Sequence, residues 1–293
     1  MKVVGVIVLV AVVAIALRSL ERIFPARDAT GAPIRTRLLA RERLTDVAHV
    51  AFNTVVTRPI VKLAGLATFV AFVLVFDLPH DRSHLYDVWH HEARLARLPI
   101  VVQAPLAVLF VDFASYWTHR AFHHGWLWRL HAIHHSSRAL DWLAGVRNHP
   151  VAEALTTTMV GGLLLVIGFD PRVLVVTAPL GLYAILLHAN VSMPGAASRM
   201  LPFGTSFVRY VVATPLFHRW HHAHPDALPE RLRSGVNFAG LLPIWDLLFG
   251  TFFAPHRTVG AERILAQPTS FGADANVPAR FLAQLAFPFR RKA

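Results

Sequence analysis

The sequence predicts an all-α integral membrane protein, with about four to five transmembrane helices and a histidine-rich helical cap on the cytoplasmic side. Of its 293 residues, 55% are apolar, whereas a soluble domain is usually about 45–50% apolar. The mean hydropathy is +0.47. The chain also has 18 histidines and no cysteine, which excludes disulfides, thiolate zinc sites and cysteine-ligated iron–sulfur clusters.

Five apolar runs are candidates for membrane-crossing helices, namely residues 3–17, 60–78, 98–118, 151–168 and 173–187. A crossing needs about 20 apolar residues. The first run is also compatible with the apolar region of a signal peptide. An uncleaved helix is favoured, because Arg18 and Arg22 follow rather than a small-residue cleavage site. The last two runs are short and suggest a tilted or incomplete hairpin.

Charge indicates how the helices are oriented and how the chain divides. Arginines crowd the loop after the first run, and such loops stay cytoplasmic. Counting crossings from there puts His119 and His188, at the ends of the third and fifth runs, on the same cytoplasmic side. We expect a membrane anchor region with a basic loop over 1–98, a histidine-rich catalytic domain over 99–253 and a C-terminal interfacial tail over 254–293.

The net charge of +12 does not indicate nucleic-acid binding. A nucleic-acid groove would combine basic residues with exposed aromatics on one face. Here the basic residues flank apolar runs, where they meet anionic lipid headgroups. The expected partners are therefore the membrane and its lipids, and not nucleic acid.

The histidines are concentrated in short clusters with helical spacing. Six of the seventeen residues from His119 to His135 are histidine, and a second cluster, HRWHH, begins at His218. Residues three and four apart share one face of a helix, so each cluster can direct several imidazoles at one point. The predicted groups are His119 with His123, then His131, His134 and His135, then His218, His221 and His222. So many imidazoles exceed the four ligands of a tetrahedral zinc and suit two metal ions.

These motifs resemble the histidine boxes of the fatty acid hydroxylase/sterol desaturase superfamily of membrane di-iron enzymes. The boxes appear as HRAFHH from His119, HAIHH from His131 and HRWHH from His218. Flanking stretches are similar too, including Tyr116-Trp117 before the first box and WDLLFGTF after the third. The resemblance covers about residues 112–253. It departs from the family pattern at Gly235, where related chains often carry an acidic residue.

The resemblance implies two iron ions on the cytoplasmic side, O2 as co-substrate and an external electron donor of the ferredoxin or cytochrome type. The substrate would be a fatty acyl, sterol-like or other isoprenoid lipid, and the setting a bacterial inner membrane. Hydroxylation is favoured over desaturation, with ether cleavage open. His123 and His124 are both retained, because family boxes use either spacing. The implied metal ligands are His119, His123, His124, His131, His134, His135, His188, His218, His221 and His222.

Other polar residues are candidates for orienting these ligands. Asp112 lies two helical turns before His119 inside an apolar run, where a carboxylate is costly and usually functional. The resemblance adds Asn237, and Asp246 is a weaker candidate, since it can instead accept bonds from backbone donors. His149 has two interpretations, an additional or outer ligand and a residue at a helix start before Pro150.

Two other function classes compete with the lipid oxygenase. A metal-ion transporter or sensor would need polar residues along a path through several helices, and apart from Asp112 the apolar runs have almost none. A zinc-dependent membrane hydrolase would keep an open coordination position beside a general base, and no glutamate is placed for that role.

Overall fold

The computed structural model describes residues 2–26, 32–33, 40–79, 81, 83–84, 93, 95–137, 140–170, 172–191, 210–254 and 276–290. Within these ranges the fold is helical, and its single β contact is an isolated bridge between Pro25 and Val191. This confirms the predicted all-α class.

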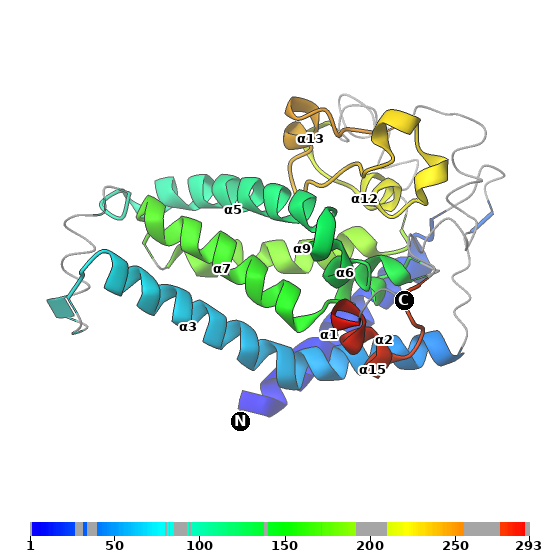
Figure 1. The fold of residues 1–293 in the computed structure, drawn as a ribbon, viewed down its shortest axis with the longest axis horizontal. Helices are drawn as coiled ribbons and strands as arrows, with labels where there is room; N and C mark the ends of the chain where they lie inside the picture. Colours follow the sequence, from blue (N-terminus) through cyan, green and yellow to red (C-terminus); the bar gives the residue numbers. More distant parts are fainter. Residues whose placement is uncertain are drawn as a thin grey trace.

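Long apolar helices form an elongated bundle at one end of the molecule (Figure 1). They are α3 (Arg58–Val75), α5 (Ile100–Phe122) and α7 (Pro150–Ile167), followed by the shorter α8 (Val173–Thr177) and α9 (Pro179–His188). Helix α1 (Lys2–Ile23) runs from the middle of the molecule toward the cap (Figure 1). Helix α7 packs against both α3 and α5, and α5 also packs against α8.

Three helical segments are long and apolar enough to cross a membrane, namely Glu42–Val75, Ile100–Phe122 and Pro150–Ile167. Only 6% of the apolar window in the first is buried inside the protein, so its apolar surface is left for lipid. The pair α8–α9, Val173–His188, is apolar but shorter. The larger number of crossings, including α1, stays a prediction.

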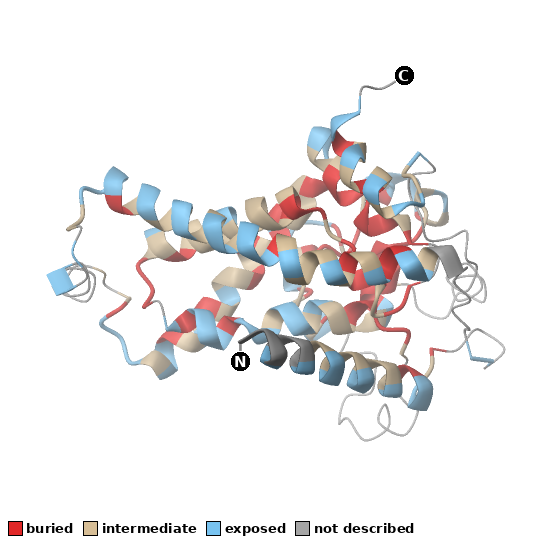
Figure 2. Cartoon of the chain, turned by 90° about the horizontal axis from the view of Figure 1, so that it is seen from below, coloured by how far each residue is buried: buried red, intermediate tan, exposed pale blue. Residues whose placement is uncertain are grey.

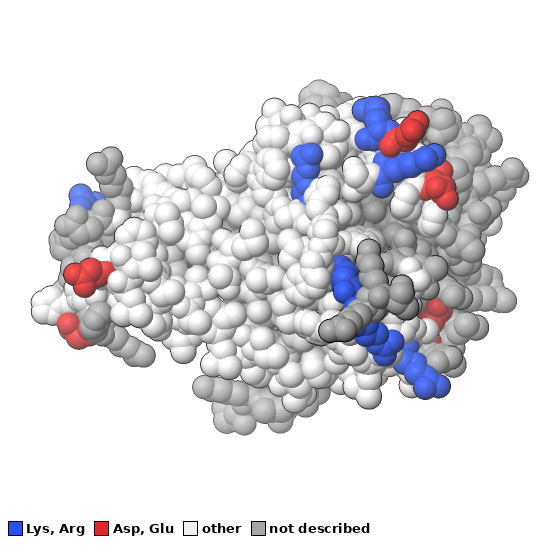
Figure 3. Space-filling model, in the orientation of Figure 1, with Lys and Arg blue, Asp and Glu red and all other residues white. Residues whose placement is uncertain are grey.

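The distribution of charge on the surface is consistent with helices that cross a membrane. Figure 3 shows charged side chains at the two ends of the molecule and an uncharged belt between them on the face that is drawn. In Figure 2 the buried residues gather where the bundle meets the cap, whereas the helix ends far from the cap are largely exposed. An uncharged belt of exposed apolar residues is what the interior of a bilayer accommodates.

The segment that precedes α3 is helical too and forms one continuous rod with it. Helix α2 (Ala40–Phe52) passes through one π-helical stretch, η1 (Asn53–Thr57), directly into α3. Asn53 donates to the Val146 carbonyl at 2.7 Å, which fastens this stretch to the cap. Asp46 and His49 are fully buried, so the α2 end packs on protein rather than lying on the bilayer.

Short helices form the cap. Those before the hairpin are α6 (Gly125–His131), η2 (His134–Ser136) and η3 (Ala144–Val146). Those after it are α12 (Pro215–His221), η4 (Pro225–Ala227), η5 (Glu230–Leu232) and α13 (Ile244–Leu248). The C-terminal pair, α15 (Phe281–Ala286) and η7 (Phe287–Phe289), docks against α2 and α6.

Local signals explain where the cap helices start. Thr214 accepts a hydrogen bond from the Phe217 backbone N–H at 3.2 Å, and Pro215 occupies the first turn of α12. This is the usual N-terminal combination of a capping side chain and proline. It places the HRWHH motif on one short helix, with His222 capping its C-terminal end.

Candidate metal centre

The histidine motifs meet where the bundle joins the cap. His119 lies in the last turn of α5, and His123 directly follows that helix. His188 ends α9. The cap supplies the remaining rings from α6, η2 and α12. Segments far apart in the sequence therefore deliver imidazoles to one buried region.

The rings form two groups, and within each group the potential ligand atoms lie within 4.8 Å of one another. We call them group A and group B. Group A contains His119, His123, His131, His135 and His221, and group B contains His134, His188, His218 and His222.

This grouping corrects the sequence prediction that neighbours three and four apart act together. Pairs four residues apart stay together, as His131 with His135 and His218 with His222, whereas His134 lies in the other group from His131. Four residues advance a helix by about 400°, close to a full turn, and three by about 300°. In addition, α6 ends at His131 and His134 begins a separate 3₁₀ turn. Adjacent histidines thus serve different groups.

The inner atoms of group A form a chain of close contacts. Nε2 of His131 lies 3.1 Å from Nε2 of His119 and 3.2 Å from Nε2 of His135. Nε2 of His135 lies 3.1 Å from Nε2 of His221. His123 adds a buried Nε2 atom that has no hydrogen-bond partner.

Group B converges on a single nitrogen. Nε2 of His188 lies 2.9 Å from Nε2 of His134, 2.9 Å from Nε2 of His218 and 3.1 Å from Nε2 of His222. All four rings are buried. One imidazole lone pair accepts only one such neighbour well, so hydrogen bonds alone do not account for this arrangement.

Backbone carbonyls fix which nitrogen carries the proton. Nδ1 of His119, His188 and His221 lies 2.7–2.8 Å from the carbonyl oxygens of Phe238, Ala184 and Val236 respectively. A carbonyl only accepts, so each Nδ1 donates, and in a neutral ring Nε2 then has only a lone pair. Metal-binding histidines are oriented in this way.

The rings outside the membrane-crossing helices are also neutral. Burial holds the pKa of His135, His221 and His222 well below 6.5, and neighbouring histidines lower it further. Several bare nitrogen lone pairs therefore face each other at about 3 Å in a largely buried site. A cation at the centre of each group removes this repulsion, so the residues present fit two metal ions.

Two other histidines of the sequence analysis lie elsewhere. His124 is exposed and precedes α6, outside both groups. His149 caps the start of α7, where its Nδ1 accepts from the Val151 backbone N–H at 3.2 Å. Its Nε2 lies 3.1 Å from the carbonyl oxygen of Leu285. Of its two interpretations, the geometry supports the helix start.

The candidate orienting residues Asp112, Asn237 and Asp246 do not bind the described histidine rings directly. They hold the backbone loop from Val236 to Leu242, which we call the orienting loop. Asp246 accepts hydrogen bonds from the backbone N–H groups of Phe238 and Ala239 at 2.8 and 2.9 Å, and from the Thr251 hydroxyl at 2.6 Å. Its carboxyl pKa is raised to about 6, mainly by burial, and these hydrogen bonds oppose the rise. The loop it holds contains the carbonyl that orients His119.

Asn237 and Asp112 hold the two ends of the orienting loop. Asn237 has φ 55°, a left-handed conformation that Asn tolerates better than most residues. Its amide group bonds the carbonyls of Phe217 and Phe253 and the Phe253 backbone N–H, all at 2.7–2.8 Å. Asp112 accepts from the backbone N–H groups of Leu241 and Leu242 and from the Trp245 indole, at 2.8–2.9 Å.

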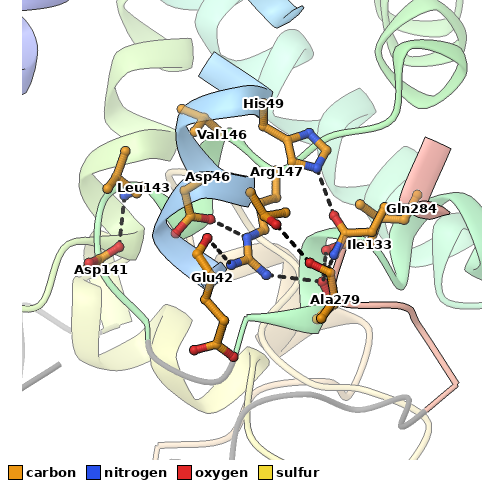
Figure 4. A network of polar contacts seen from close by, with 12 residues as sticks. Glu42, Asp46, His49, Ile133, Asp141, Leu143, Val146, Arg147, Ala279 and Gln284 are labelled. Carbon is orange, nitrogen blue, oxygen red and sulfur yellow. Dashed lines mark hydrogen bonds and ion pairs between the residues drawn. The ribbon is translucent and has the colours of Figure 1, made fainter. Parts of the chain in front are cut away.

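A second buried network, which no sequence pattern indicates, supports the HAIHH segment. Arg147 pairs with the fully buried Asp46 and donates to the Ser136 hydroxyl at 3.3 Å. Figure 4 shows Arg147 pointing at Asp46, with His49 facing Gln284 beside them. Gln284 also donates to Ser136, at 3.3 Å. Helix α2 and the C-terminal helix thus fix the residue that follows His135.

The chain is similar to known proteins over the region that holds this site. The family model described as "Fatty acid hydroxylase" matches residues 104–251. The chain is 31% identical to ornithine lipid hydroxylase OlsE of Rhizobium tropici, over 86% of this chain and 67% of that protein.

Two further similarities cover less of the relative. The chain is 30% identical to human alkylglycerol monooxygenase, over 52% of this chain and 31% of that protein. It is also 31% identical to very-long-chain aldehyde decarbonylase GL1-6 of Oryza sativa subsp. indica, over 52% of this chain and 23% of that protein. No solved structure matches the chain. The matched region contains both ends of the site, from α5 to α13, and the resemblance seen in the histidine motifs is confirmed: the chain belongs to the fatty acid hydroxylase family.

Proposed function

We propose that this protein is a membrane-bound di-iron enzyme that uses O2 to hydroxylate a C–H bond of a lipid. One observation carries the proposal: two adjacent groups of neutral imidazoles direct bare nitrogen lone pairs inward, at the end of an apolar helical bundle. Family membership supports lipid hydroxylation as the activity.

The proposed ligands are the nine histidines of groups A and B. Imidazole also suits zinc, copper and nickel, so the assignment of iron rests on the family. Bound iron supplies the redox chemistry that no amino-acid side chain provides. The C–H bond becomes C–OH, and the second oxygen atom of O2 leaves as water with two electrons and two protons from an external donor. A ferredoxin or cytochrome would supply the electrons.

The chain's own residues hold and orient this centre. The carbonyls of Val236 and Phe238 keep the group A rings His221 and His119 pointing inward. All four rings of group B are buried, which excludes bulk water. The lipid's apolar part approaches from the bilayer along the exposed helix faces, and we place the histidine cap on the cytoplasmic side of a bacterial inner membrane.

Metal analysis of the purified protein tests the proposal. We expect about two iron ions per chain in wild type, loss of about one in His134→Ala from group B, and unchanged content in His124→Ala and in the exposed His84→Ala. Lipids incubated with the reduced enzyme and isotope-labelled O2 should gain one labelled oxygen. One zinc per chain with no labelled product would instead favour a hydrolase, and equal metal loss in His124→Ala and His134→Ala would contradict the ligand assignment.

A further inference from the structure

A cavity of about 250 Å³ leads from group A to the protein surface. Its lining includes His123, His135 and His221 of group A. His135 and His221 are buried, whereas the lining residues Arg233 and Ser234 are exposed. The metal position in group A is thus accessible from outside, whereas no residue of group B lines this cavity.

The exposed residues of the cavity, Arg233 and Ser234, belong to the segment between α12 and α13 in the cap. The walls include the apolar residues Trp128, Ala223, Pro225 and the buried Leu228. No acidic residue is among the lining residues that the structure describes. A polar mouth over apolar walls matches a small amphipathic group.

Arg233 is the cation at this mouth. Its guanidinium makes no hydrogen bond or ion pair within the described part of the chain. An arginine fork binds carboxylate and phosphate oxygens in a bidentate manner. Ser234, next to it, adds a hydroxyl that can donate to the same anion.

We propose that this cavity binds the anionic headgroup of the lipid substrate, a carboxylate or a phosphate, with Arg233 and Ser234 as its contacts. The inference rests on the proposed function in assuming that the ligand is the substrate. Pockets for drug-sized ligands are about 300–1,000 Å³, so this smaller cavity holds a headgroup and a few carbons rather than a whole lipid. The carbon that reaches group A is then one close to the polar end.

Binding of fluorescent lipids to the iron-loaded protein in nanodiscs tests the proposal. The probes are a phosphatidic acid, a fatty acid and an uncharged fatty alcohol that carry the same fluorophore. We expect Arg233→Gln to weaken binding of the two anionic probes about tenfold and to leave the alcohol unchanged. Arg233→Lys should fall between, because it keeps the charge and loses the fork.

Arg231→Gln is the matched control. Arg231 is also exposed and lies two residues away, but it does not line the cavity. Its replacement by Gln removes the same charge. Equal weakening in both variants would reduce the effect to general surface charge and overturn the proposal. Displacement of the probes by inorganic phosphate near their own Kd would assign the site to a free anion and overturn the headgroup assignment.

Iron content and labelled product are measured on the same samples. Product formation in Arg233→Gln with unchanged probe binding would refute the headgroup site while the proposed function stands. Arg233-dependent binding without product from any lipid would refute the function while the anion site stands.

Discussion

The replacement Asp246→Asn tests whether one carboxylate controls the loop that orients group A. Asp246 is fully buried and accepts three hydrogen bonds, from the Phe238 and Ala239 backbone N–H groups and the Thr251 hydroxyl. An asparagine oxygen replaces one carboxylate oxygen. Its NH2 group then faces either the Phe238 or the Ala239 N–H, donor against donor.

The expected cost follows from this count. A hydrogen bond to a charged group contributes about 1.5–3 kcal/mol, and a buried donor left without a partner costs about 1–3 kcal/mol. These two figures partly describe the same lost interaction and do not add in full, so we expect the free energy of unfolding to fall by about 2–4 kcal/mol. At about 2–4 °C per kcal/mol for a chain of this size class, Tm falls by about 4–16 °C.

The metal content gives a sharper readout than Tm. The disturbed loop contains Val236 and Phe238, whose carbonyls orient His221 and His119 of group A. No ring of group B bonds this loop within the described residues. We therefore expect Asp246→Asn to lose mainly the ion of group A and to retain that of group B.

Elemental analysis and a thermal melt of the same preparation measure both effects. Asp226→Asn is the control, because it removes one carboxylate of the same segment whose side chain is 81% exposed. The reasoning is refuted if Asp246→Asn retains both ions and melts within about 2 °C of the control.

Two further predictions concern other buried positions. Burial, followed by neighbouring carboxylates, raises the pKa of Asp141 from 3.8 to about 7. A folded-state pKa above the unfolded value means that the protonated form stabilises the fold fully below about pH 4 and that this stabilisation is lost as the pH rises through about 7. The Tm advantage of wild type over Asp141→Asn should therefore shrink as the pH rises from about 4 to about 7; a difference in Tm that does not change with pH would contradict the assignment. At Gly145, an added Cβ would lie 2.9 Å from Nδ1 of His188, so Gly145→Ala should displace this ring and lower the metal content of group B. Gly181→Ala, with nothing within 4 Å, should keep both ions and gain about 0.5–1 kcal/mol of stability, and equal metal content in the two variants would show that His188 tolerates the shift.

The sequence indicated the fold class and the chemistry of the site through local patterns. Apolar runs of the length of a bilayer crossing give helices, and histidines four residues apart share a face. Both patterns act within one segment, so they are readable without knowing what lies next to it. Because this spacing acts within one helix, histidines four residues apart lie in the same group in the structure, as the sequence predicts.

The grouping of the remaining rings was decided by contacts between segments. His188 pairs with His134 and His218, although neither is near it in the sequence. The network of Arg147, Asp46 and Gln284 joins helices α2 and α15 to the segment that follows η3, and no sequence spacing signals it. Asp112 was expected beside the histidines, and it instead holds the loop at Leu241 and Leu242.

The sequence by itself thus determined an apolar helical bundle with enough imidazoles for two metal ions. The tertiary structure decided which ring belongs to which ion, which nitrogen each ring presents, and where the centre opens to the surface. These three properties depend on backbone carbonyls and cavity walls that come from distant segments, such as Phe238 for His119 and Arg233 for the cavity beside group A. A hydrogen bond to a carbonyl is independent of the identity of the residue that supplies it, so no side-chain pattern reveals it in advance.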